Sequence, residues 1–133
     1  MDCIFCKIIN GNIPARKIYE DEYTLALLDI ADDVDGHTLV IPKKHLNNIL
    51  DCDTDTLAHL MNTVRLISVH YVNNCGYHGV NLLNASGTAA QQSVPHFHIH
   101  VIPRKNNDEI NAWPNFKGAN KSADEMLKIL KVN

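Results

Sequence analysis

A cluster of histidines near residue 98 is the strongest chemical signal in the sequence. From His96 to Val101, histidine alternates with Phe, Ile and Val. This two-residue period is typical of a strand with one apolar face and one face that carries three imidazoles. Same-face positions are about 6.6 Å apart, so His96 and His100 would lie about 13 Å from each other, too far to bind one metal ion at ~2 Å. The three imidazoles are therefore expected to have different tasks.

A pair of cysteines at the amino end offers a second kind of chemistry. Cys3 and Cys6 form a Cys-x-x-Cys motif, which is found both in dithiol redox centres and as half of a zinc site. A redox motif of this kind should follow a strand and open a helix, and only two residues precede Cys3. Zinc is therefore favoured, with two further ligands from elsewhere, although a metal-free pair of buried thiols is an alternative.

Several short motifs together carry a resemblance to a known family. The pattern His-x-His-x-His-x-x and the preceding Gln-Ser-Val resemble the histidine triad (HIT) nucleotide-binding proteins. Other stretches resemble the branch of small homodimeric phosphoramidases and nucleotide hydrolases, namely Cys3 to Lys7, Leu28 to Ile30, Gly36 to Pro42 and Lys43 to His45. The resemblance spans most of residues 3 to 104. It implies a nucleotide as the small-molecule partner and a homodimer as the assembly.

The resemblance also implies a complete zinc site. The positions that match the family's metal ligands are Cys3, Cys6, His45 and His96. A zinc ion with four protein ligands has no open position for water, so the zinc would be structural. It would tie the amino-terminal segment to the histidine strand.

The catalytic roles follow from the same resemblance. His98 matches the nucleophile, which would form a nucleotidyl-histidine at an α-phosphate that water then cleaves. A neutral imidazole, with a pKa near ~6.5, can attack without a separate base, and its other nitrogen needs an acceptor such as a backbone carbonyl. His100 and His37 match the flanking histidines that neutralise phosphoryl charge, and Ser93 with His100 is expected to protonate the leaving atom. An alternative for His37 is a purely structural role.

The expected substrate contacts are also taken from matched positions. Asp29 would accept the ribose hydroxyls, and Asn84 would contact ribose or phosphate. Gln92 belongs to the loop expected to hold the phosphate. The apolar residues expected to sandwich a purine, or otherwise simply to form core, are Phe5, Ile8, Leu27 and Ile30. The chain departs from the pattern at Leu27, where a larger aromatic is common, and at Gln91, where glycine is common.

Composition limits the class of protein. At 133 residues and 45% hydrophobic content, the chain is expected to form one domain, residues 1–133, with a core at 3–104 and a tail at 105–133. A formal charge of −3 without a basic stripe argues against nucleic acid as a partner. No apolar run reaches membrane-span length and the amino end does not resemble a signal peptide, so a cytoplasmic location and no membrane partner are expected.

Periodicity predicts an α+β fold with a five-stranded antiparallel sheet. A long amphipathic helix should begin at Asp53 or Thr54 and end near Gly76. Short terminal helices are expected at residues 3–9 and 124–131, and the strands at 17–20, 24–30, 37–41, 77–84 and 97–103. With the resemblance, this predicts a HIT-like fold whose sheet continues across a homodimer through the long helix and an edge strand.

The function predicted for this chain is hydrolysis or transfer at the α-phosphate of a purine nucleotide derivative. Candidate substrates are an adenosine phosphoramidate, an aminoacyl-adenylate or a dinucleoside polyphosphate. Two alternatives stay open. One is a hydrolase whose catalytic zinc is held by two of the three alternating histidines. The other is a nucleotide-binding adaptor with little activity.

Overall fold

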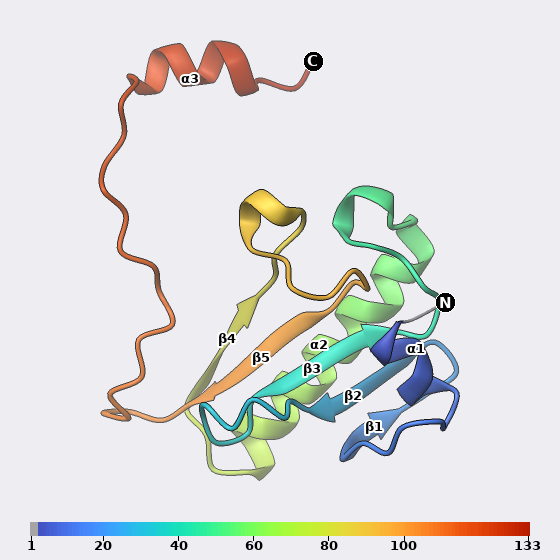
Figure 1. The fold of residues 1–133 in the computed structure, drawn as a ribbon. Helices are drawn as coiled ribbons and strands as arrows, with labels where there is room; N and C mark the ends of the chain where they lie inside the picture. The colour runs from blue at the N-terminus through green and yellow to red at the C-terminus, as the bar shows by residue number, and fades with distance from the viewer. Residues whose placement is uncertain (1–2) are drawn as a thin grey trace.

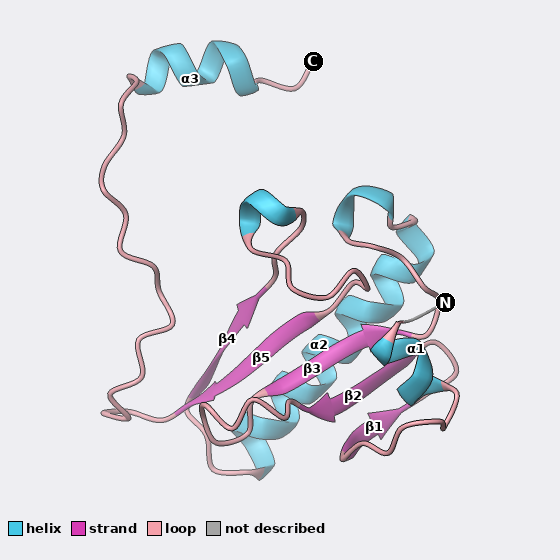
Figure 2. Cartoon of the chain, viewed as in Figure 1, coloured by secondary structure: helices cyan, strands magenta, loops and turns pink. Residues whose placement is uncertain are grey.

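A five-stranded antiparallel sheet organises the protein in the computed structural model, which describes residues 3–133 (Figures 1 and 2). Its strands lie in the order β1-β2-β3-β5-β4. Their bounds are β1 Lys17–Glu20, β2 Thr24–Leu28, β3 Thr38–Pro42, β4 Gly79–Leu83 and β5 Ile99–Arg104. The helices are α1 Ile4–Ile9, α2 Thr54–Asn74 and α3 Ala123–Leu130, with short 3₁₀ turns η1 Ile49–Asp51 and η2 Thr88–Ala90. The predicted α+β class, strand number and long helix are confirmed.

The long helix α2 covers one face of the sheet. Asp53 caps its amino end by accepting a hydrogen bond from the amide of Thr56 at 3.0 Å, and Gly76 follows its carboxyl end at φ +82°. The apolar side chains of α2 recur every three or four residues and are buried against the sheet. They form one core with inward residues of three strands, and the helix contributes Leu60, Val64, Ile67 and Tyr71.

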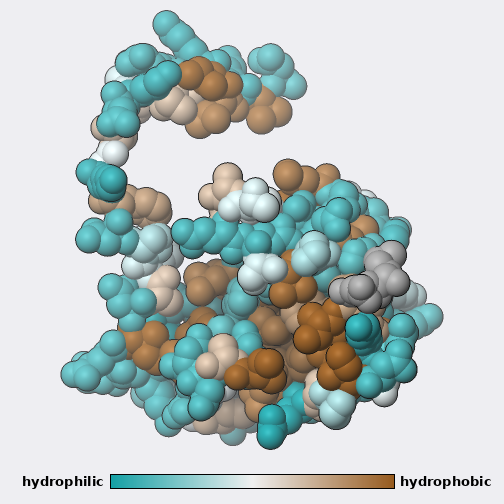
Figure 3. All heavy atoms as spheres, in the orientation of Figure 1, coloured by the Kyte–Doolittle hydropathy of each residue, from teal (hydrophilic) through white to brown (hydrophobic). Residues whose placement is uncertain are grey.

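The opposite face of the sheet packs against α1. Strand residues alternate between the two faces, so Ala26 and Val40 face α2 while Leu27 and Leu39 belong to the cluster on the α1 side. Apolar atoms gather on this second face in the space-filling view (Figure 3). The face that α1 only partly covers is therefore the one on which a ligand site can form.

The last strand begins later than predicted. β5 starts at Ile99, so His96 and His98 precede it and the three imidazoles do not share one regular strand. The segment leaves the ladder because the amide of Phe97 donates to the carbonyl of Leu46 at 2.7 Å instead of to a neighbouring strand. Ile99 and Val101 still face α2, so His100 between them faces the α1 side.

The chain after β5 leaves the sheet. It runs as an extended segment to α3, which lies apart from the sheet (Figure 1). α3 begins with a capping box between Ser122 and Glu125. Among the described residues, no helix combines the length and apolar character needed to cross a membrane.

Candidate active site and metal centre

Four side chains from three parts of the chain converge at the end of the sheet. Sγ of Cys3 lies 3.3 Å from Nδ1 of His96, and Sγ of Cys6 lies 3.3 Å from Nδ1 of His45. The two Nδ1 atoms are 3.1 Å apart, and all four potential ligand atoms lie within 4.8 Å of one another. Cys3 caps α1, His45 follows β3, and His96 precedes β5. The fold thus brings together residues that are far apart in the sequence.

This cluster fits a zinc ion. Two thiols and two imidazoles with converging donor atoms are a common tetrahedral zinc set. Nε2 of His96 donates to the carbonyl of Pro42 at 2.8 Å, which leaves Nδ1 with its lone pair directed at the cysteines. Burial lowers the pKa of His96, which favours the neutral imidazole that a metal requires. A bound zinc would crosslink α1 to the histidine segment, and its four protein ligands would make it structural.

A pocket of about 220 Å³ lies beside this cluster, between α1, the end of β2 and the histidine segment. It brings together most of the predicted site, namely Phe5, Ile8, Leu27, Asp29, Ile30, Ser93, His98 and His100. It is also lined by four apolar residues for which the sequence predicted no site role, Ile4, Leu28, Leu39 and Val94. All four lie within the quoted family motifs, but their residue types suit an ordinary core equally well.

His98 is held in one tautomer. Its Nδ1 lies 2.7 Å from the carbonyl oxygen of His96, which can only accept a hydrogen bond, so Nδ1 carries the proton. Nε2 therefore keeps the lone pair. The ring of Phe5 meets the His98 ring edge-on at 5.3 Å between centroids, and the His98 side chain is nearly buried. The expectation that a backbone carbonyl fixes this tautomer agrees with the geometry.

His100 and His37 form a pair behind the pocket. Nδ1 of His100 lies 2.8 Å from Nε2 of His37, which does not itself line the pocket. Burial lowers the pKa of His100 to about 4, and the neighbouring charges of His98 and His37 act in the same direction. Asp29 lies at the end of β2, with Oδ2 3.4 Å from Nε2 of His37.

Asn84 and Gln92, both predicted to contact substrate, lie outside the lining of the pocket. Asn84 does not line the pocket, because its Nδ2 donates to the carbonyl of His98 at 2.8 Å. It holds the segment that carries His98 in place.

Gln92 is likewise absent from the pocket wall, because its side-chain amide is fully engaged within the surrounding loops. Nε2 donates to the carbonyls of Asn47 and Val94 at 2.6 and 2.9 Å. Oε1 accepts from the amide of Gly87 at 2.8 Å and from Nδ2 of Asn48 at 3.1 Å. Gln92 thus braces the loop before the histidines, and its contact with substrate stays a prediction.

The neighbouring Gln91 adopts a left-handed backbone conformation, which costs more for glutamine than for the glycine that is common at this position. It ends η2 at φ +70°, in the left-handed region that favours glycine. A residue with a β-carbon at this position therefore adds local strain that glycine would not.

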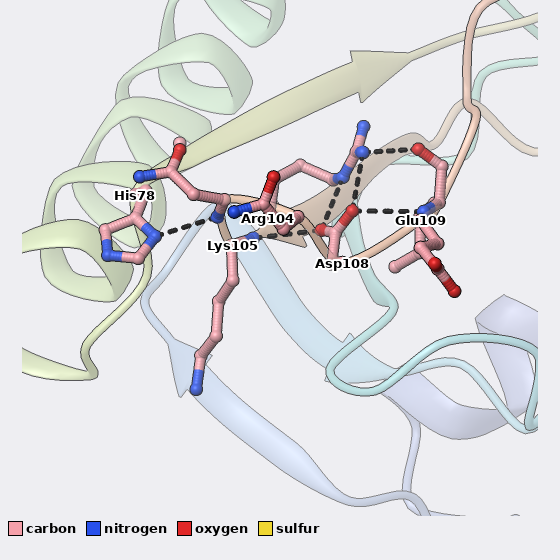
Figure 4. Close-up of a pocket in the computed structure, with 9 residues that line it drawn as sticks. His78, Arg104, Lys105, Asp108 and Glu109 are labelled. Carbon is pink, nitrogen blue, oxygen red and sulfur yellow. Dashed lines mark hydrogen bonds and ion pairs between the residues drawn. The ribbon is translucent and has the colours of Figure 1, made fainter.

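A second hollow, of about 450 Å³, lies at the other end of β5 (Figure 4). Arg104 lines this hollow, and its guanidinium group donates to the carboxylate of Asp108 through Nε at 2.9 Å and Nη2 at 2.8 Å. It also donates to Oδ1 of Asn81 and to the carbonyl of Ile110. Arg104 and Asp108 satisfy each other's charge, and their contacts fix the path of the chain after β5.

Comparison with known proteins shows the family of this chain. The HIT domain family matches residues 10–107, and the chain belongs to this family. An adenosine 5′-monophosphoramidase of Schizosaccharomyces pombe is 38% identical over 119 residues, covering 87% of this chain and 86% of that protein. An adenylylsulfatase of Arabidopsis thaliana is 43% identical over 107 residues, which is 80% of this chain and 54% of the relative.

A solved structure shares the fold. The crystal structure of a zinc-bound histidine triad family protein from Mycobacterium smegmatis superimposes with a TM-score of 0.78 at 39% identity, covering 86% of this chain and 84% of that one. The HIT fold expected from the sequence is therefore shown.

Proposed function

We propose that this protein hydrolyses purine nucleotide derivatives at the α-phosphate through a nucleotidyl intermediate on His98. The observation that carries the proposal is the fixed tautomer of His98 at the wall of the pocket. With Nδ1 donating to the carbonyl of His96 at 2.7 Å, Nε2 is the nitrogen left to attack phosphorus. The related monophosphoramidase and adenylylsulfatase support chemistry at an adenylyl phosphorus.

The reaction has two displacements. In the first, Nε2 of His98 attacks the α-phosphate and the leaving group departs as His100 and Ser93, which also line the pocket, supply its proton. In the second, water cleaves the phosphorus–nitrogen bond and frees the nucleoside monophosphate. Adenosine phosphoramidate, aminoacyl-adenylate and dinucleoside polyphosphate all present such a phosphorus.

The pocket offers an apolar slot and one carboxylate for the nucleoside. Phe5, Ile8, Leu27 and Ile30 give a surface for either face of a purine, and Asp29 at its rim would accept the ribose hydroxyls. Oδ1 of Asp29 accepts from the amide of Ala31 at 2.9 Å, which orients the carboxylate. An apolar slot does not read base edges, so we expect little discrimination between adenine and guanine.

We also propose a structural zinc and a homodimer. The zinc would be held by the Cys3, Cys6, His45 and His96 cluster, in keeping with the zinc-bound relative. Native mass spectrometry should find one zinc per chain, and Cys6→Ser should lose it.

The dimer would form where β4 ends the sheet and α2 exposes apolar side chains such as Leu66 and Val69. Sedimentation velocity should give twice the chain mass, and Leu66→Glu should lower it.

The two alternative functions make different demands on His98. A catalytic zinc would need His98 among its ligands, yet His98 belongs to neither group of converging ligand atoms in the described part of the chain. A nucleotide-binding adaptor would bind nucleotide without turnover, and His98→Ala would leave its role unchanged.

Release of AMP from adenosine 5′-phosphoramidate tests the proposal. His98→Ala should lower kcat by about 10³-fold or more, because removing a covalent nucleophile costs about 10⁶-fold in a serine protease. His70→Ala, which changes an exposed histidine of α2, serves as the matched control and should leave kcat unchanged. Full activity in His98→Ala would refute the proposal.

A further inference from the structure

A third ionisable side chain extends the His37–His100 pair away from the pocket. Nδ1 of His37 lies 2.8 Å from Oδ1 of Asp33, and Nε2 of the same ring lies 2.8 Å from Nδ1 of His100. The His37 side chain is only 11% exposed, whereas Asp33 is 53% exposed. The three groups form one hydrogen-bonded line from solvent to the pocket wall.

Asp33 decides where His37 carries its proton. The hydrogen bond from His37 lowers the pKa of Asp33, so this side chain is an ionised carboxylate at neutral pH. The amide of Val34 also donates to Oδ1 of Asp33 at 2.9 Å and holds the carboxylate in position. A carboxylate only accepts, so Nδ1 of His37 must be the protonated nitrogen.

This constraint couples Nε2 of His37 to the pocket. When His37 is neutral, its Nε2 accepts a hydrogen bond from Nδ1 of His100, and Nε2 of His100 has no proton to donate. When His37 is a cation, its Nε2 donates to Nδ1 of His100, and Nε2 of His100 carries a proton toward the pocket. Burial disfavours a cation on His100, whose pKa is about 4, whereas His37 lies against the Asp33 carboxylate at 2.8 Å.

We propose that Asp33 is a positioning residue of the reaction, which keeps a proton on Nδ1 of His37 so that His37 stores the proton that His100 delivers. The inference rests on the proposed function and adds the source of its acid. The arrangement makes His37 and His100 act as one acid with the charge held next to a carboxylate.

With a phosphoramidate as substrate, the protons balance over the two half-reactions. The phosphorus–nitrogen bond of the substrate breaks as the bond from phosphorus to Nε2 of His98 forms. The departing amine takes the proton from Nε2 of His100. His100 then gains a proton at Nδ1 from Nε2 of His37. When water cleaves the intermediate, its proton goes to Nε2 of His100 and the Nδ1 proton returns to His37. His37 donates to Asp33 throughout.

Other charged groups also face this line. Asp29 is a second carboxylate near this ring, with Oδ2 3.4 Å from Nε2 of His37. His98 faces His100 at 5.0 Å between ring centroids and disfavours charge there. Because Asp29 lines the pocket and is proposed to bind the ribose, Asp33 is the carboxylate that remains on His37 when substrate is bound.

The pH dependence of amine release in a single turnover separates this role from a structural one. The alkaline limb reports loss of the proton from the acid, and its midpoint should move about one pH unit lower in Asp33→Asn. An opposite charge at contact distance shifts a pKa by about 1–3 units, and the exposure of Asp33 places the effect at the low end. Asp35→Asn removes the same charge at an exposed position two residues away and should leave the limb in place.

Nitrogen-15 NMR of the histidine rings gives a second readout that needs no turnover. In the parent protein, Nδ1 of His37 should carry the proton, and in Asp33→Ala the two tautomers should mix. An alkaline limb that is identical in Asp33→Asn and the parent, or a His37 tautomer unaffected by Asp33→Ala, would overturn the inference. A parent protein that never releases amine would instead refute the proposed function, and the NMR result would still test the Asp33 contact.

Discussion

Gly36 gives a sharp test of how the fold positions His37, the next residue in the chain. Gly36 has φ +78°, and a β-carbon placed on it would lie 2.9 Å from Cγ of Pro103 in β5 and 3.5 Å from the hydroxyl oxygen of Tyr77. Its carbonyl also accepts a hydrogen bond from Oγ1 of Thr38 at 2.7 Å. Gly36→Ala should therefore strain the turn that leads into β3.

The expected cost has two parts. A left-handed conformation costs a residue with a β-carbon about 1–2 kcal/mol relative to glycine. Overpacking against a rigid proline ring adds about 1–3 kcal/mol. Gly76→Ala supplies the control, because Gly76 has φ +82° but its β-carbon would meet open space among the described residues. We therefore expect a loss of about 2–5 kcal/mol for Gly36→Ala and about 1–2 kcal/mol for Gly76→Ala.

Urea unfolding at a fixed zinc concentration measures both costs in one assay. Unchanged slopes with separate midpoints would give the difference in unfolding free energy directly. Equal destabilisation of the two variants would show that Pro103 yields at no cost, and the argument from the close approach would then be wrong.

Two further predictions concern Gln91 and His100. Gln91→Gly should raise the unfolding free energy by about 0.5–1 kcal/mol, because relief of left-handed strain exceeds the backbone entropy that glycine adds; a lower thermal midpoint would contradict this. The folded-state pKa of His100 is about 4, below its unfolded value, so its contribution to stability is present above about pH 6.5 and is lost as the pH falls toward 4. His100→Gln should therefore remove about 3 kcal/mol of the parent's decline in stability over that range, and parallel declines would refute the assigned cause.

The elements that the sequence predicted well are those with a strong local signal. The helix α2 combines a capping aspartate, a regular apolar spacing and a terminal glycine, and its bounds agree with the prediction closely. The zinc ligands were assigned from matched positions, and the fold brings all four together.

The elements that it missed depend on long-range contacts. The start of β5 was placed too early because the bond from Phe97 to Leu46 and the contacts of His96 with Cys3 and Pro42 carry no local pattern. The contact of Asp33 was missed for a similar reason. A carboxylate four residues before a histidine means little until a turn brings Asp33 to His37 and the fold brings His37 to His100.

The bracing role of Gln92 was hidden by its resemblance to a substrate-binding loop. Its residue type suits either a ligand or a backbone carbonyl, and only the position of the loop at residues 47–48 decides between them. The amide of Asn84 likewise reaches the carbonyl of His98, a contact that no local pattern indicates.

The central claim, that Nε2 of His98 forms a bond to phosphorus, is tested most directly by mass spectrometry of protein quenched rapidly during turnover of adenosine 5′-phosphoramidate. The account predicts one adenylyl group per active chain, located on His98 by peptide mapping and absent from His98→Ala. Turnover without any such adduct, together with activity that survives in His98→Ala, would contradict it.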